Sequence, residues 1–475
     1  MENQLPFLLF LLTFLFVTFR ALRTWRNTKS SSLPSMLPPG PPKLPLIGNL
    51  HLVIGTQPHR CLARLAQKYG PVMLLQLGEV STAVISSPEA AKQVMKTHDS
   101  VFSERPYLYA AQFITYNFRD IAFARGDYMR QIRKICVLEL LSNKRVQSFR
   151  PIREEEISNL VRTISSKAGS PINLKNLLYS SALSILSRTA FGGKCKHQDV
   201  FKKLIPDILA LFGGLSIVDV YPSVKLLHLI NAMRPKIKKL HNKVDEILES
   251  VIQERRATKL TTMTGESEVD DLVQVLLDIQ DHGDLEVPIS TSSIKAIILD
   301  MFLGGEVRHV FAGRRDVDEL GIHELKYLRL VIKETLRLHP TGPLLLPREC
   351  QVHCEVNGCV VPAKSRVIVN VWAIGQDQNY WAQAEKFYPE RFCDSSINYK
   401  GTDFEFIPFG AGRRMCPGMS YGIASVELLL ANLLYHFDWK LPNGKKPEDL
   451  DMTELFGASL QRKEDLCVVP IPHHL

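Results

Sequence analysis

The sequence contains no Cys-x-x-Cys pair, and its nine cysteines are an odd number without regular spacing. This excludes a disulfide framework and is expected of a chain in a reducing compartment. Neither positive nor negative charge dominates, because the chain has 58 Lys and Arg and 49 Asp and Glu, and the two kinds are interleaved along it. With no basic tail, nucleic-acid binding has little support, and the net charge of +9 fits an anionic membrane surface or an acidic protein partner.

The composition still describes a folded chain, since 45% of the 475 residues are hydrophobic and can form a sizeable core. The proline-rich stretch from Leu37 to Pro42 is a stiff spacer and the strongest linker signal. After it, only Thr261 to Asp271 has the polar composition of a long loop. We therefore expect a basic and proline-rich linker over residues 23–45 and one domain over residues 46–475.

The one long apolar run covers residues 5–19 and is near the lower length limit for spanning a bilayer. A cleaved signal peptide is the alternative, but no basic residue precedes the run and no small-x-small cleavage site follows it. We expect an uncleaved anchor over residues 1–22. The basic residues after the run predict a cytosolic location for the rest of the chain, which in a eukaryote means the endoplasmic reticulum: Arg20, Arg23, Arg26 and Lys29.

Helical signals dominate the rest of the sequence. Ser87-Pro88-Glu89 has the residues of a helix start, and residues 237–251 carry a long amphipathic stripe. Short β-branched or apolar runs at residues 72–77, 82–86 and 367–371 predict strands. The expected fold class is mainly α with small β-sheets.

A glycine-rich turn between Phe409 and Gly418 carries one cysteine, Cys416, beside two arginines. The apolar residues that follow, at positions 426–437, have helical spacing and place Cys416 just before a helix N-terminus. The helix dipole, the unpaired first-turn amides and the guanidinium groups all favour a thiolate there.

A thiolate in this turn can ligate iron. Gly412 and Gly418 let backbone amides approach the sulfur and leave room for a flat macrocycle, and Arg414 can pair with a haem propionate. The alternative is a reactive or merely buried thiol. A second cysteine cluster raises the possibility of zinc, but its spacing matches no closed zinc site well and a β-turn at Asn357-Gly358 fits it better: Cys350, His353, Cys354 and Cys359.

Two further motifs precede the cysteine turn. Glu334 and Arg337 are three residues apart on one predicted helix face, where they can pair with each other or with a third partner. Pro389-Glu390-Arg391-Phe392 follows downstream. In this order, the motifs resemble the ExxR helix, the PERF motif and the haem loop of the cytochrome P-450 superfamily, whose signature is matched at all five fixed positions: Phe409, Gly412, Arg414, Cys416 and Gly418.

The resemblance extends over nearly the whole chain and is strongest to the plant A-type enzymes of the 71 clan, with flanking text similar to the 71D group. It implies haem b with Cys416 as the axial ligand to iron, and Arg133 and Arg348 beside Arg414 around the propionates. It also implies a buried ionic network of Glu334, Arg337 and Arg391 that supports the haem side of the core.

This sequence departs from the family pattern at two places. Met129 stands where the family has the tryptophan of a Trp-x-x-x-Arg motif, and the preceding Arg125-Gly126 looks one residue short. Loss of that indole donor is expected to weaken haem binding by roughly 1 to 2 kcal/mol.

The second departure follows Asp300 to Gly305, which resemble the start of the family's long central helix. The next residues, from Glu306, resemble the segment before the ExxR helix instead, so roughly thirty residues are missing, a span of about 45 Å as α-helix. The oxygen-activating threonine is therefore absent, and neither Thr291 nor Thr335 is assigned a catalytic role. A splice variant or an incorrect gene model is the simplest origin.

By family resemblance, the expected function is haem-thiolate monooxygenation of an apolar plant secondary metabolite with O2, a terpenoid being preferred to an alkaloid or phenylpropanoid. Electrons are expected from NADPH through a membrane-bound cytochrome P-450 reductase that docks on the basic face near Cys416. Residues 344–346 and 455–458 correspond to substrate-contact regions of the family or are plain core. The alternatives are a haem-thiolate isomerase or dehydratase and a non-catalytic membrane haem protein.

Overall fold

The computed structural model describes residues 36–55, 57–193, 197–213, 216–261, 271–283, 285–306, 325–457 and 459–473. The chain divides into two compact units. The smaller unit contains the residues up to Pro106, Leu215–Ile230 and Leu344–Asp377, and the larger unit contains Tyr107–Gly214, Asn231–Pro343 and Gln378–Leu475. The predicted anchor, residues 1–22, lies outside the described residues, and within those residues no helix has the length and apolarity needed to cross a membrane.

The smaller unit is built on a four-stranded sheet in the order β1-β2-β7-β4. β1 and β2 form an antiparallel hairpin with Val72 opposite Ile85, and β2 runs parallel to β7 with Thr82 opposite Arg366. Its elements are α2 (Leu50–Val53), α3 (Pro58–Tyr69), β1 (Val72–Leu77), β2 (Val80–Ile85), α4 (Pro88–Lys92), η1 (Gln93–Thr97), α5 (Asp99–Phe102), α12 (Ile217–Val220), α13 (Lys225–Ile230), β4 (Arg348–Glu349), β5 (Cys354–Val356), β6 (Cys359–Val361), β7 (Arg366–Val369) and α18 (Val371–Gly375).

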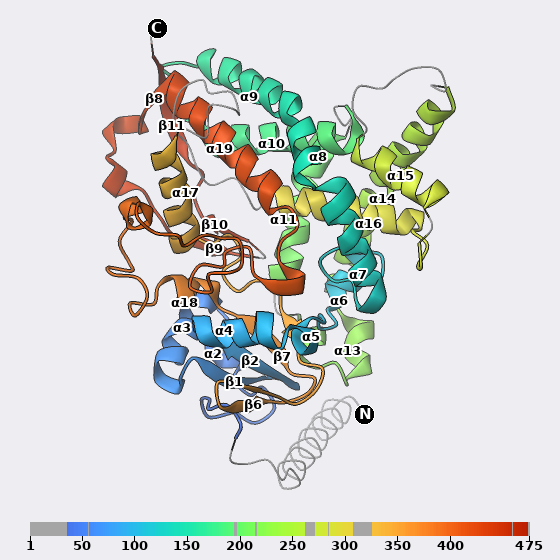
Figure 1. The fold of residues 1–475 in the computed structure, drawn as a ribbon, viewed down its shortest axis with the longest axis vertical. Coiled ribbons are helices and arrows are strands. Elements are labelled where there is room, and N and C mark those ends of the chain that lie inside the picture. The colour runs from blue at the N-terminus through green and yellow to red at the C-terminus, as the bar shows by residue number, and fades with distance from the viewer. Residues whose placement is uncertain are drawn as a thin grey trace, which may run out of the picture. The chain divides into compact units, whose positions relative to one another are not determined.

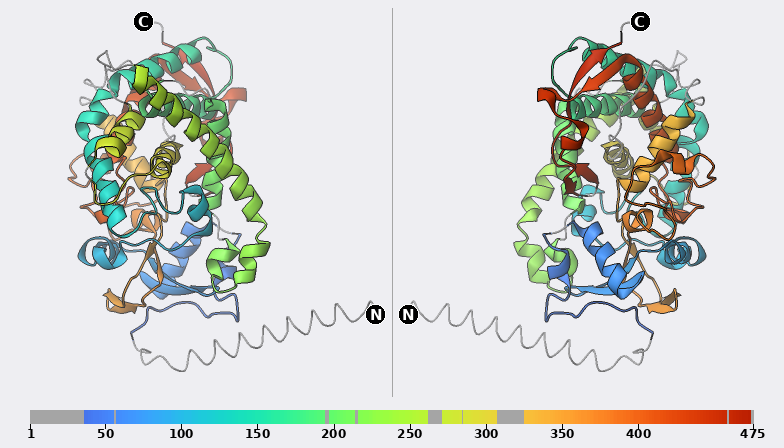
Figure 2. Two further views of the ribbon diagram at one scale, coloured as in Figure 1. Left: turned by 90° about the vertical axis from the view of Figure 1, so that its right-hand side faces the viewer. Right: turned by 90° about the vertical axis from the view of Figure 1, so that its left-hand side faces the viewer.

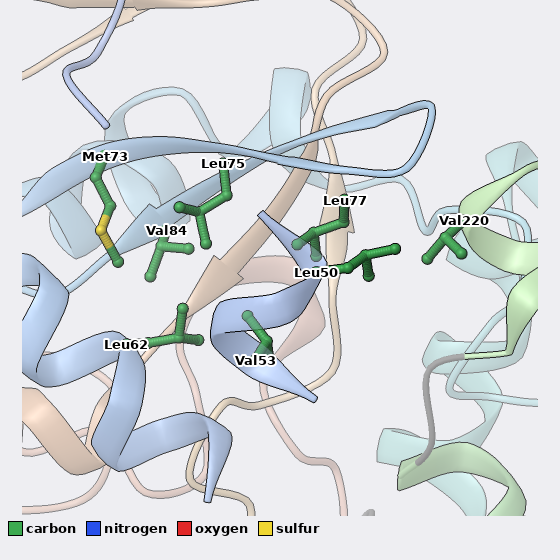
Figure 3. Packing of buried hydrophobic residues seen from close by; sticks show 8 residues of the cluster. All are labelled: Leu50, Val53, Leu62, Met73, Leu75, Leu77, Val84 and Val220. Atoms are coloured by element: carbon green, nitrogen blue, oxygen red, sulfur yellow. The ribbon is translucent and has the colours of Figure 1, made fainter. Parts of the chain in front are cut away.

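One face of the hairpin is covered by short helices. Alternate residues of β1, which point to the same face of the sheet, pack with side chains of α2 and α3 into a buried apolar cluster (Figure 3). The cluster consists of Leu50, Val53, Leu62, Met73, Leu75, Leu77, Val84 and Val220. Its burial holds the hairpin against the helices and gives the smaller unit a core of its own.

The larger unit is mostly helical (Figure 1). Its elements are α6 (Tyr109–Ile114), α7 (Gly126–Ile135), η2 (Cys136–Leu140), α8 (Asn143–Ser148), α9 (Arg150–Ser165), β3 (Ile172–Asn173), α10 (Leu174–Phe191), α11 (Gln198–Gly213), α14 (Met233–Thr261), α15 (Leu272–His282), α16 (Thr291–Glu306), α17 (Lys326–Leu338), η4 (Pro389–Phe392), η5 (Gly412–Arg414), α19 (Met419–His436), β8 (Phe437–Lys440), η6 (Pro442–Gly444), η7 (Pro447–Asp449), β9 (Glu454–Phe456), β10 (Leu460–Arg462) and β11 (Cys467–Pro472).

Within this unit α9 packs against α10 and α19, and α10 in turn packs against α16. The strands β8 and β11, coloured red in Figure 2, lie beside this group and form a small sheet in the order β3-β11-β8. A buried cluster joins α17, the residues around η4 and α19: Ile332, Leu336, Trp381, Ala384, Phe392, Phe406 and Leu430. This packing places the segment before α19 against a well-filled core.

The predicted secondary structure is confirmed in its main features. The Ser87 side chain accepts a hydrogen bond from the Ala90 amide at the start of α4. The strand predicted at residues 72–77 is β1, while the other two predicted strands begin one or two residues earlier, as β2 and β7. The amphipathic stripe at residues 237–251 lies within α14, and the fold class is mainly α with small sheets, as predicted.

Candidate functional site

The cysteine turn is a closed loop that ends where a long helix begins. Gly410 and Gly412 have φ values of 70° and 68°, which only glycine adopts without strain. The Cys416 amide donates to the Phe409 carbonyl at 2.9 Å, and α19 starts three residues after the cysteine, at Met419. Cys416 is a half-buried free thiol at this helix N-terminus, as the sequence predicted.

Two arginines attach this loop to the segment around α7. The buried Arg414 donates from Nη2 to the Ala124 carbonyl at 2.5 Å, and Arg133 donates from Nη2 to the Met415 carbonyl at 2.5 Å. A thiol at a helix N-terminus with two guanidinium groups beside it is a donor set suited to a thiolate-ligated, dianionic macrocycle. The residues present therefore fit a haem group.

Phe409 and Gly418 occupy the two ends of the loop. The Phe409 ring packs against the cluster around α17 and lies edge-on to Tyr399, with ring centroids 5.7 Å apart. Gly418 is buried, and its carbonyl accepts the Gly422 amide at the start of α19. These contacts fix the ends of the loop and leave the cysteine between them.

Arg348 belongs to the smaller unit. It lies in β4, where its Nη1 donates to Asp99 Oδ1 at 2.9 Å and both side chains are almost fully buried. The structure therefore brings Arg133 to the cysteine loop, which contains Arg414, and gives Arg348 a carboxylate partner. The contact of Arg348 with a propionate stays a prediction.

The predicted ionic network forms within the larger unit. Glu334 accepts from Arg337 Nε and Nη2, both at 2.8 Å, and from Arg391 Nε at 3.1 Å. The backbone amide of Tyr388 donates to the same carboxylate at 2.8 Å, and the Glu334 and Arg337 side chains have no exposed area. Both carboxylate oxygens thus accept hydrogen bonds, three at Oε1 and one at Oε2, as a buried charge cluster requires.

The helix α16 begins like the family's central helix and ends at Glu306, and the described chain resumes at residue 325. The two threonines that the sequence left without a role both make hydrogen bonds within the helical core. Thr291 Oγ1 accepts from Arg256 at 3.4 Å, and Thr335 Oγ1 donates to the Val331 carbonyl of its own helix at 2.7 Å. Neither contact suggests a catalytic role.

The zinc alternative has no support in the described residues, which contain no group of three or more His, Cys, Asp or Glu side chains placed to hold a metal. Cys354 and Cys359 lie in the hairpin β5–β6, whose turn is Asn357-Gly358, as expected from the sequence. Burial raises the pKa of Cys350 to about 12 and also raises that of Cys354, so both thiols are neutral near pH 7 in this structure.

Sequence reasoning missed a pair of acids near this site, the fully buried Asp120 and the half-buried Asp300. Asp300 lies within a run of hydrophobic residues in α16, and its carboxylate accepts hydrogen bonds from the amides of Ile121 and Ala122. A lone acid within an otherwise apolar helical stretch was the available signal. Met129, at the position of the family's tryptophan, is buried in α7.

The sequence and the fold both match known proteins of one family. The sequence model of the family described as cytochrome P450 matches residues 38–306 and 305–468, two segments that meet at Gly305 and Glu306. A zebra fish cytochrome P450 structure with abiraterone superposes with a TM-score of 0.73 at 22% identity, covering 88% of this chain and all of that chain. That likeness establishes the fold.

Sequence relatives are closer. Premnaspirodiene oxygenase of Hyoscyamus muticus is 48% identical over 490 residues, covering 97% of each chain. Cytochrome P450 71D11 of Lotus japonicus is 48% identical over 477 residues, covering 94% of this chain and 97% of its own. The predicted similarity to the 71D group is confirmed. From these matches over nearly the full length, the chain belongs to the cytochrome P450 family of monooxygenases, whose cofactor is haem with an axial cysteine thiolate.

Proposed function

We propose that Cys416 is the axial thiolate ligand of haem and that the chain derives from a monooxygenase of apolar plant metabolites. One observation carries this proposal: the Cys416 amide closes a loop just before α19, its thiol is half-buried there, and Arg414 and Arg133 hold the neighbouring backbone. The helix N-terminus and both guanidinium groups give this loop the positive potential that an anionic cofactor needs. When bound, haem supplies the activation of O2.

The protein's own residues then have separate tasks. Arg414 and Arg133 hold the loop in place and present positive charge to propionates, while the Glu334 network fixes α17 to the turn at η4. Arg348 is the third propionate candidate, at the end of a buried ion pair with Asp99. These roles require a rigid loop, which the backbone hydrogen bond from Cys416 to Phe409 provides.

The substrate we propose is a terpenoid, with an alkaloid as the second choice. The support is the name of a relative at 48% identity, a premnaspirodiene oxygenase, together with the similarity to the 71D group. Of the two candidate substrate-contact stretches, Leu346 and Leu455 are exposed apolar side chains in the described structure. An apolar substrate is the ligand class that such side chains favour.

The electron donor we propose is NADPH-cytochrome P450 reductase, docking beside α7. Arg133 ties α7 to the cysteine loop, and both segments present exposed cations, Lys134 and Arg413. An acidic partner surface would be steered to this region. We further propose that residues 1–22 anchor the chain in the endoplasmic reticulum membrane with the rest of the chain, residues 46–475 included, on the cytosolic side.

We also propose that this chain lacks the oxygen-activating segment of its relatives. The alignment with premnaspirodiene oxygenase runs over 490 positions, whereas 97% of this chain is about 461 residues, so about 29 positions of the relative face a gap. The two family matches meeting at residues 305 and 306 are consistent with a gap there. A splice variant or an incorrect gene model explains this best; an isomerase or dehydratase, which needs no such segment, is the second candidate.

The test compares two full-length proteins, the chain as written and a version with the missing segment of a close relative inserted between Gly305 and Glu306. We expect both to show the thiolate-type absorbance of the reduced carbon monoxide complex, and only the second to oxidise a terpenoid with NADPH and reductase. Absence of the thiolate band from both proteins would overturn the proposal. Turnover of an oxidised substrate by the unextended chain, without reductase, would support the isomerase.

A further inference from the structure

Two carboxyl groups from distant parts of the larger unit meet at the segment before α7. Asp300, on α16, accepts hydrogen bonds at Oδ2 from the amides of Ile121 at 2.7 Å and Ala122 at 3.0 Å. Asp120, directly before these amides, accepts from the Phe123 amide at Oδ2 and has no exposed area. The amides of three consecutive residues, 121–123, thus donate to one or the other carboxyl.

The remaining oxygen of Asp120 identifies the protonation state of the pair. Asp120 Oδ1 is buried without a hydrogen-bond donor among the described residues, because the nearby Thr115 hydroxyl donates to the Ala111 carbonyl at 2.8 Å, and this is costly for an ionised carboxylate. Neither acid forms an ion pair with a cation in the described part of the chain. Two unneutralised carboxylates cannot share a buried site, but a single proton between them removes one charge and supplies the missing donor.

The surrounding titratable groups do not neutralise the pair. Burial raises the pKa values of Tyr128 on α7 and Cys136 on η2, so both stay uncharged near neutral pH. The two neighbouring cations have other acceptors: Arg119 donates to Ser290 and Ser293, and Arg133 donates to the Met415 carbonyl. Burial, and for Asp120 the neighbouring carboxylate, raise the pKa of both acids, that of Asp300 to about 7.

We propose that Asp120 and Asp300 share one proton and act as a positioning pair that fixes residues 121–124 against α16. The next residue of this segment, Ala124, gives its carbonyl to Arg414, two residues before Cys416. The pair therefore sets the position of the carbonyl that holds Arg414 beside the cysteine loop. This last link rests on the proposed function of that loop, whereas the shared proton does not.

The sign of the pH dependence follows from the raised pKa values. The folded protein keeps a proton that the unfolded chain releases at the usual aspartate pKa, so the stabilisation is complete below that value. It is lost as the pH rises through the folded pKa of the pair. Above that pH both carboxylates are charged, and their repulsion loosens the segment from α16.

The first test is the pH dependence of unfolding for the wild type and for Asp120→Asn, both as full-length chains. An asparagine amide donates to Asp300 without a titrating proton, so we expect the variant to lose up to a tenfold change in the unfolding equilibrium constant per pH unit between about pH 4 and pH 7. Asp300→Asn, whose amide oxygen still accepts Ile121 and Ala122, is a second variant with the same expectation. Parallel curves for the wild type and both variants would overturn the shared proton.

Asp465→Asn is the matched control. Asp465 accepts from Asn173 and pairs with Lys175, and these contacts lower its pKa. Its replacement should therefore remove a constant amount of stability above the usual aspartate pKa, change the slope only below that pKa, and leave the slope nearer neutrality unchanged.

The second test separates this inference from the proposed function. Hydrogen exchange of the peptide containing residues 121–124 is measured above pH 7, with and without haem, for the wild type and Asp120→Asn at equal pH. We expect faster exchange in the wild type, because only its pair carries two charges there. If the wild type and Asp120→Asn exchange at equal rates and the thiolate spectrum is normal, the positioning pair is refuted and the function of Cys416 is not. If the exchange rates differ as expected and no thiolate spectrum is seen, the function of Cys416 is refuted and the positioning pair is not.

Discussion

Replacing Glu334 by alanine should destabilise the larger unit more than any exposed acid nearby. The Glu334 carboxylate accepts three guanidinium N–H groups and one backbone amide, and it has no exposed area. Its removal leaves Arg337 and Arg391 charged inside the protein. Breaking a buried ion pair from one side costs about 3 to 5 kcal/mol, which is a large share of the stability of a folded protein.

Part of this cost is offset by other acceptors. Arg337 also donates to the Ala384 carbonyl at 2.7 Å, and Arg391 to the Ala382 carbonyl at 2.7 Å. These carbonyls partly solvate the orphaned charges, so we expect the lower half of the range, about 3 to 4 kcal/mol. Glu334→Gln keeps the side-chain shape and one acceptor oxygen, and its cost should be smaller, about 1.5 to 3 kcal/mol.

The assay is urea unfolding of the full-length proteins, followed by circular dichroism and by haem content. The control is Glu390→Ala in η4, the turn that carries Arg391, since Glu390 is exposed and accepts the Tyr327 hydroxyl at 2.9 Å. That variant should stay within about 0.5 kcal/mol of the wild type. Equal destabilisation by Glu334→Ala and Glu390→Ala would refute the reasoning, because it would mean that Arg337 and Arg391 are well stabilised without the Glu334 carboxylate.

Three further predictions concern the cysteine loop and its surroundings. Cys416→Ser should abolish the thiolate-type carbon monoxide spectrum, whereas Cys393→Ser, at an exposed free cysteine, should retain it. Gly412→Ala should lower the free energy of unfolding by about 1 to 2 kcal/mol, because φ is 68° there. Gly342→Ala, whose new methyl group would have no atom within 4 Å, should leave the melting temperature unchanged. Met129→Trp should restore an indole donor and tighten haem binding by about 1 to 2 kcal/mol, measured as slower haem transfer to a second apoprotein; an unchanged rate would contradict it.

The structure of the cysteine loop could be predicted from the residues immediately around it. The apolar spacing after Cys416 placed the cysteine before a helix, and α19 begins at Met419. Gly412 was expected to allow a close approach, and its positive φ is consistent with a glycine requirement. Both features depend on the backbone of a few neighbouring residues, which is why the sequence alone was sufficient.

The ionic network divides into a local and a distant part. Glu334 and Arg337 are one helical turn apart, so their pairing follows from the periodicity of α17. The contact of Arg391 depends on the packing of α17 against η4, which only the motif order of a known family could anticipate. Periodicity does not report which two elements of a chain become neighbours.

Motifs and periodicity were enough to identify the family, the mainly helical class and the helix start beside Cys416. The gap at residues 305 and 306 and the membrane anchor at residues 1–22 stay predictions from the sequence. The folded structure was needed to show that Arg133 binds the Met415 carbonyl, that Arg414 binds the Ala124 carbonyl, and that Asp120 and Asp300 meet. Local patterns follow from backbone geometry within a few residues, whereas these contacts join residues 179 to 290 positions apart and depend on how the whole core packs.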